Sequence, residues 1–127
     1  MKSRHSTLQA KRFEVTEKAR KVASLEMMVI DLEHTAMELA WQISIEEKRT
    51  GVKNPAHIAY STLAKATTLR RTNLLNSVAD LRAKLDMARC ELEGMEAELR
   101  ALEVDKTRDA DRPLRKIDQT VADARPS

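Results

Sequence analysis

The fold is decided by residues 74–102, which read LLNSVADLRAKLDMARCELEGMEAELRAL. Apolar residues recur there at alternating spacings of four and three, which is the a and d pattern of a coiled-coil heptad. These positions are Leu74, Val78, Leu81, Leu85, Ala88, Leu92, Met95, Leu99 and Leu102. Followed backward, the same frame reaches Tyr60 through the polar residues Thr67 and Arg71. The stretch therefore predicts one long amphipathic helix.

The first part of the chain repeats the pattern. Its a positions, each seven residues apart, are Leu8, Val15, Val22, Val29, Ala36 and Ile43. Its later d positions are Leu25, Leu32 and Leu39, whereas the earlier d positions are Lys11 and Lys18. A second long helix is therefore expected, with a seam that weakens toward the N-terminus.

A short break separates the two patterns. Gly51 suits the left-handed position just past a helix end, and Asn54 followed by Pro55 suits an N-cap and the first residue of the next helix. A short loop between long amphipathic helices makes them antiparallel neighbours. We therefore expect an all-α protein, a long antiparallel two-helix coiled-coil hairpin with a short C-terminal tail that can itself form a helix. The expected parts are a first arm at 1–49, a bend at 50–54, a second arm at 55–106 and a tail at 107–127.

Charge independently favours this pairing. The net charge is +5 over residues 1–24, −4 over 25–49, +5 over 50–89 and −5 over 90–111. Folding the chain at Gly51 brings each block against its opposite, whereas a parallel homodimer would align like charges. This fold also predicts a register, in which Val22 lies opposite Leu81 and Leu32 lies opposite Arg71. The flanking pairs expected in it are Glu26 with Arg82 and Arg12 with Glu96.

Two surfaces and the bend are the candidate binding regions. On the back of the seam, apolar residues repeat at helical spacing, and exposed Met and Trp side chains are typical of interfaces. These residues are Met27, Ile30, Met37 and Trp41, extended by Ile45. Two interpretations of this face stand: the protein's own tail covers it through Leu114, Ile117 and Val121, or another protein docks on it. The second surface is a basic arm of Lys2, Arg4, Lys11 and Arg12, and the bend residues are Gly51, Asn54, Pro55, His57 and Tyr60.

Catalytic and metal sites are not expected. His5, His34 and His57 lack metal-ligand spacing, and Cys90 falls on an outer heptad position with no identifiable base. The carboxylates Glu91, Glu93, Glu96 and Glu98 are best interpreted as a solvated face paired with the basic N-terminal block. We therefore expect no enzyme activity, no metal and no cofactor.

The amino-acid composition argues for a coiled coil and against several other classes of protein. About half of the 127 residues are Ala, Glu, Lys, Leu or Arg, which is typical of coiled coils. The net charge is +3 and only three residues are aromatic, so a nucleic-acid interface built on stacking is disfavoured. A membrane-surface role is disfavoured because the apolar a and d residues of the first arm are already used by the seam. There is no apolar run of membrane-spanning length and no signal peptide, so we expect a soluble cytoplasmic protein.

Several segments resemble a known family. The opening Met1-Lys2-Ser3-Arg4, the stretch KRFEV at residues 11–15, and NPAHIAYSTLAKA at residues 54–66 are similar to the J-type component (FliJ) of the bacterial flagellar type III export apparatus. The later Arg71-Thr72-Asn73-Leu74 fits as well.

This resemblance implies a stalk-like antiparallel coiled coil that links the hexameric export ATPase ring to the cytoplasmic part of the export gate and to export chaperones. It also implies a cytoplasmic location, peripheral to the inner face of the cell membrane at the flagellar base. The alternative is a generic coiled-coil adaptor or scaffold outside the flagellum.

Overall fold

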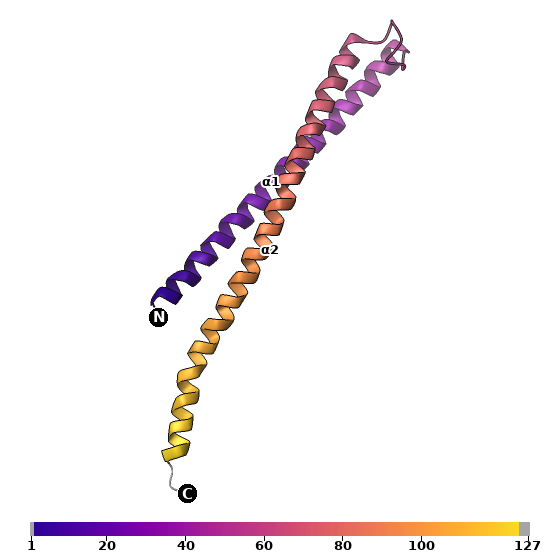
Figure 1. Cartoon of the computed structure of the whole chain (residues 1–127). Helices are drawn as coiled ribbons and strands as arrows, with labels where there is room; N and C mark the ends of the chain where they lie inside the picture. Colours follow the sequence, from indigo (N-terminus) through magenta and orange to yellow (C-terminus); the bar gives the residue numbers. More distant parts are fainter. Residues whose placement is uncertain (1, 125–127) are drawn as a thin grey trace. The chain divides into compact units, whose positions relative to one another are not determined.

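Two long helices account for most of residues 2–124, the part of the backbone that the structure describes. A computed structural model describes the backbone of residues 2–124 and the side chains of residues 3–108. Helix α1 spans Lys2–Thr50 and helix α2 spans Thr62–Ala124 (Figure 1). The described backbone contains no strand. The prediction of an all-α fold is therefore confirmed.

The chain divides into two compact units. The first, which we call the hairpin unit, comprises Lys21–Arg89, and the second, the terminal unit, comprises Met1–Arg20 together with Cys90–Ser127. Within the hairpin unit, α1 and α2 lie side by side and antiparallel (Figure 1). Hydrogen bonds join Arg82 to Glu33 over 2.6 Å and Arg89 to Glu26 over 3.1 Å. The predicted antiparallel pairing of the two arms is confirmed in this unit.

The core of the hairpin unit is the predicted seam. All of its buried apolar side chains occupy predicted a or d positions, and each contributes roughly 1.5–3 kcal/mol when fully buried, less for alanine. They are Val22, Leu25, Val29, Ala36, Leu39, Tyr60, Ala64, Val78, Leu85 and Ala88. The 3.5-residue period thus determines which faces of the two helices meet.

The predicted register is wrong by about one heptad. Glu26 pairs with Arg89 rather than Arg82, which is one heptad further along α2. In the predicted register, Glu33 would lie level with Arg70, and Arg82 would lie roughly 18 Å away at about 1.5 Å per residue. Instead, Arg82 bonds directly to Glu33. Because a shift of one heptad returns the same a and d positions to the seam, the burial pattern is unchanged.

The longer bend explains this shift. α1 ends at Thr50, one residue beyond the predicted first arm at 1–49, and Gly51 follows in the expected left-handed conformation with φ of 73°. The second helix begins at Thr62, however, and not at Pro55. Asn54 does not cap it, because its side-chain oxygen accepts a hydrogen bond from the Ala56 N–H over 3.0 Å and so closes a local turn. The return of the chain therefore starts about one heptad later than the sequence predicts.

Ser61 is the residue that caps α2. Its hydroxyl oxygen accepts a hydrogen bond from the backbone N–H of Ala64 over 3.1 Å. This is the contact that an N-cap makes with the third residue of a helix. The segment between the helices is held by two further turns, in which the His57 N–H bonds to the Asn54 carbonyl and the Tyr60 N–H bonds to the His57 carbonyl.

The terminal unit pairs by charge more than by burial. Among the described residues of this unit, Leu8 is the one apolar side chain that is buried. Lys11 pairs with Glu98 over 2.5 Å and Lys18 pairs with Glu91 over 2.6 Å. Arg12 lies 3.6 Å from Glu103 instead of pairing with Glu96, again one heptad beyond the predicted partner. The acidic run on α2 therefore meets the basic N-terminal block, as the sequence predicts.

The last part of the chain differs from the predicted division. α2 continues past residue 106 to Ala124, so the helix extends through most of the segment predicted as a separate tail. Pro113 removes one backbone donor from a helix, and it does not end α2. The predicted cover by Leu114, Ile117 and Val121 lies outside the described side chains, as does the side chain of Lys2.

Candidate functional site: an apolar stripe on α1

Large apolar side chains are exposed along one face of α1 in the hairpin unit. We call this face the apolar stripe, and it consists of Met27, Ile30, Met37, Trp41 and Ile45. Met37 is 71 % exposed and Trp41 is 67 % exposed. These residues occupy heptad positions on the side of α1 away from the seam, so the pairing with α2 cannot bury them. The predicted location of the stripe on the back of the seam agrees with these exposures.

A shallow hollow lies within the stripe. It is lined by His34, Met37, Glu38, Trp41 and Gln42. The His34 ring lies 3.4 Å from the Glu38 carboxylate, so these two side chains of the hollow lie beside each other. An exposed indole beside a thioether is a favourable surface for another protein, because both groups bury a large area and adapt to their partner's shape.

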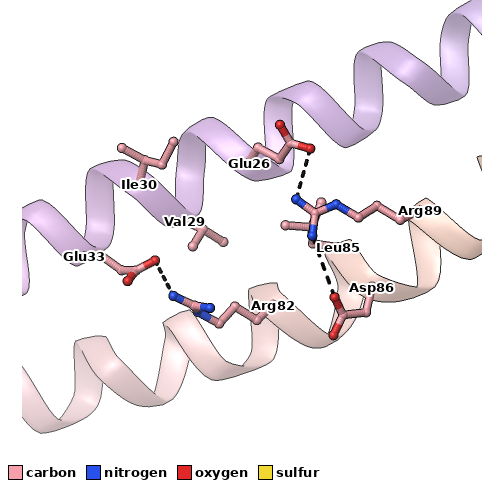
Figure 2. A pocket seen from close by; sticks show the side chains of 8 residues that line it. All are labelled: Glu26, Val29, Ile30, Glu33, Arg82, Leu85, Asp86 and Arg89. Atoms are coloured by element: carbon pink, nitrogen blue, oxygen red, sulfur yellow. Dashed lines mark hydrogen bonds and ion pairs between the residues drawn. The ribbon is translucent and has the colours of Figure 1, made fainter.

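Ile30 connects the stripe to a groove between the helices. Figure 2 shows this groove in the hairpin unit, with Val29 and Leu85 lying between the two ribbons. Two interhelical ion pairs cross it, one from Arg82 to Glu33 and one from Arg89 to Glu26 (Figure 2). Asp86 also lies near Arg89, at 4.0 Å. The arginines therefore neutralise the two glutamates that border this side of the stripe.

A charged residue that was not predicted to have a role, Glu46, stabilises the bend. Glu46 is only 8 % exposed and accepts hydrogen bonds from Arg49 and Ser61, at 2.6 Å and 2.8 Å to the same oxygen. These bonds, that from Arg49 foremost, lower the pKa of Glu46 to about 2. The signal was present, since Glu46 continues the d positions seven residues after Leu39. A carboxylate in the seam needs a local partner, and Ser61 supplies one from the start of α2.

The predicted bend residues act in different ways. Tyr60 is buried and donates a hydrogen bond from its hydroxyl to Glu47 over 2.9 Å. Burial first, and the nearby Glu47 second, raise the pKa of Tyr60. The His57 ring nitrogen Nδ1 accepts a hydrogen bond from the Ala59 N–H over 3.0 Å, while Pro55 is exposed in the turn. These residues shape the connection between the helices.

The basic arm is largely engaged within the chain. Lys11 bonds to Glu98 and to Glu14, and these hydrogen bonds raise its pKa. Arg12 lies beside Glu103, and Arg4 lines a small hollow with Leu8 and Leu102. The structure thus does not bring the basic arm and the apolar stripe into one site: the first lies in the terminal unit and the second in the hairpin unit.

Other kinds of site find little support among the described residues. Within that part of the chain, no three His, Cys, Asp or Glu side chains come together as a metal site would require. Cys90 is exposed, as its heptad position predicts. In the same residues, neither helix has a stretch apolar and long enough to traverse a bilayer.

Comparisons with known proteins give no relative. No family model, no curated protein and no solved structure matches this chain.

Proposed function

We propose that this protein is a non-enzymatic coiled-coil component of the bacterial flagellar type III export apparatus. It links the export ATPase ring to the export gate and to export chaperones through protein–protein contacts alone. The observation that carries the proposal is the exposed apolar stripe, with Met37 and Trp41 about two-thirds exposed on a helix whose opposite face is already paired. Contiguous apolar surface of this kind is typical of docking sites.

The flagellar assignment depends on resemblance. It is supported by the segment at residues 54–66, which in this structure forms the end of the bend and the start of α2. It is also supported by the paired antiparallel helices of the hairpin unit, since the resemblance implies a coiled coil of this kind. A generic adaptor outside the flagellum remains the alternative function, because a helical hairpin with an apolar face serves many assemblies.

Co-purification and motility test this proposal. We expect a tagged full-length chain, expressed in its own bacterium, to co-purify with the export ATPase and the cytoplasmic part of the export gate. A strain that lacks the gene should lose most of its motility. Met37→Asp should weaken co-purification, whereas Met87→Asp, a change at a comparably exposed methionine of α2, should not. Normal motility in the deletion strain, with no export protein recovered, would favour the generic adaptor.

A further inference from the structure

The surface charge around the apolar stripe indicates what kind of partner docks there. From Val22 to Glu47, α1 contains no Lys or Arg, while it carries six carboxylates. These are Glu26, Glu33, Glu46 and Glu47, together with Asp31 and Glu38. The stripe is thus embedded in a strongly acidic segment of α1.

Four of these carboxylates are occupied within the hairpin unit. Glu26 and Glu33 pair with Arg89 and Arg82 across the groove of Figure 2. Glu46 is held by Arg49 and Ser61, and Glu47 accepts the hydrogen bond of Tyr60. Their charge or bonding capacity is therefore largely satisfied by the protein itself.

The other two carboxylates, Asp31 and Glu38, are not occupied in this way. They lie seven residues apart on α1, at the edge of the stripe away from the groove, and both are exposed. Within residues 3–108, Asp31 forms no ion pair. The ion-pair partner of Glu38 there is His34, a group that carries charge only when protonated. Among residues 3–108, therefore, no lysine or arginine neutralises the two carboxylates at this edge of the stripe.

The geometry of the stripe favours a helix as its occupant. The stripe extends from Met27 to Ile45, which corresponds to about 27 Å of helix at about 1.5 Å per residue. Its members follow the spacing of one helix face, so a second helix lying along α1 can contact them in sequence. The same partner would place the residues that flank its own apolar face next to Asp31 and Glu38.

We propose that the apolar stripe binds an amphipathic helix of a partner protein whose apolar face is bordered by Lys or Arg. Apolar contact with Met37 and Trp41 provides most of the affinity, and the basic residues meet Asp31 and Glu38, which selects the partner. A second copy of this chain fits less well, because two such stripes would bring their acidic edges together. The inference rests on the proposed function, in that the stripe is a protein-docking surface, and it adds the chemistry of the partner.

Trp41 provides the measurement, since it is the single tryptophan of the chain. Two designed helical peptides without tryptophan serve as probes, with one identical Leu/Ala face bordered by Lys in the first and by Glu in the second. The full-length protein should bind the Lys peptide with a blue shift of Trp41 emission. Its affinity at low salt should be on the order of tenfold higher than for the Glu peptide, and this preference should decrease as salt is added.

Variants identify the groups responsible. The double variant Asp31→Lys/Glu38→Lys should reverse the preference between the two peptides. Its matched control, Asp80→Lys/Glu93→Lys, makes the same charge change at exposed positions of α2 and should leave the preference intact. Met37→Asp should abolish binding of the Lys peptide while Met87→Asp retains it, with circular dichroism verifying that each variant keeps its helices.

Three results would overturn the inference. The first is no binding of the Lys peptide, or equal or weaker binding than that of the Glu peptide. The second is binding that Met37→Asp leaves unchanged. The third is concentration-dependent dimerisation in light scattering that Met37→Asp removes, which would identify a second copy as the occupant.

A flagellar co-purification that depends on Met37, combined with no peptide preference, would refute the partner chemistry alone. Peptide preference with no co-purification would refute the flagellar assignment alone.

Discussion

The hairpin unit and the terminal unit use the same heptad frame but hold their helices together differently. In the hairpin unit, apolar side chains such as Val29, Leu39 and Leu85 fill the seam. In the terminal unit, Leu8 is the buried apolar side chain among the described residues, and Lys11 and Lys18 occupy d positions with glutamate partners. Apolar burial involves no charge that salt could screen, whereas exposed ion pairs are weak and screened. We therefore expect the hairpin unit to be stable and the terminal unit to open more readily.

The largest effect should come from the seam of the hairpin unit. Leu39 is 3 % exposed, so Leu39→Ala leaves a cavity and should lower the free energy of unfolding by about 2–5 kcal/mol. Leu102→Ala, at a half-buried position of the terminal unit, is the matched change and should cost clearly less. Urea unfolding followed by circular dichroism measures both. Equal losses in the two variants would remove the distinction between the units.

The bend should give the next largest effect, and this effect should depend on pH. Hydrogen bonds from Arg49 and Ser61 lower the pKa of Glu46 to about 2, below the ordinary glutamate value of about 4.3. The ionised group therefore stabilises the folded state fully above about pH 4.3, and this contribution is lost as the pH falls toward about 2. Glu46→Gln should lower Tm at pH 7. The Tm difference from the unchanged protein should shrink across this acidic window, and a difference independent of pH would contradict the assignment.

A smaller effect is expected from the lysines of the terminal unit. Lys18 pairs with Glu91 over 2.6 Å, and the Glu91 side chain is 52 % exposed. Molar salt screens such a pair, so hydrogen exchange within residues 3–20 should accelerate while exchange in the hairpin unit changes little. Lys18→Met replaces the pair with an apolar side chain of similar length and should reduce this salt dependence. An equal salt response in both units would show that ion pairs are not what distinguishes them.

The smallest effect should come from the exposed pair across the groove. Arg82 and Glu33 are 58 % and 41 % exposed, and pairs of this kind contribute a few tenths of a kcal/mol. Arg82→Ala should therefore change stability far less than Leu39→Ala. A double-mutant cycle with Glu33→Ala isolates the interaction. A coupling as large as the loss at Leu39 would mean that charge, and not the apolar seam, holds the hairpin unit together.

The sequence predicts well which side chains are buried and which are exposed, because this depends only on the heptad period. Leu25 and Val78 are buried and Trp41 is exposed wherever the bend falls, since each heptad position has a fixed side of its helix. The register depends instead on the length of the connection. Asn54-Pro55 suits a helix start, yet Asn54 closes a turn and Ser61 caps the helix. The partners of Glu46 were also beyond prediction, because Ser61 reaches it only through the observed bend.

Intramolecular cross-linking measures whether α1 and α2 of one chain pair antiparallel in the observed register. The variant Glu33→Cys/Arg82→Cys, in a Cys90→Ala background, replaces two side chains that bond to each other over 2.6 Å. A short bismaleimide should link them within a single chain, giving a product of monomer mass with one internal cross-link by mass spectrometry. Products of dimer mass only, or no internal link, would contradict the hairpin.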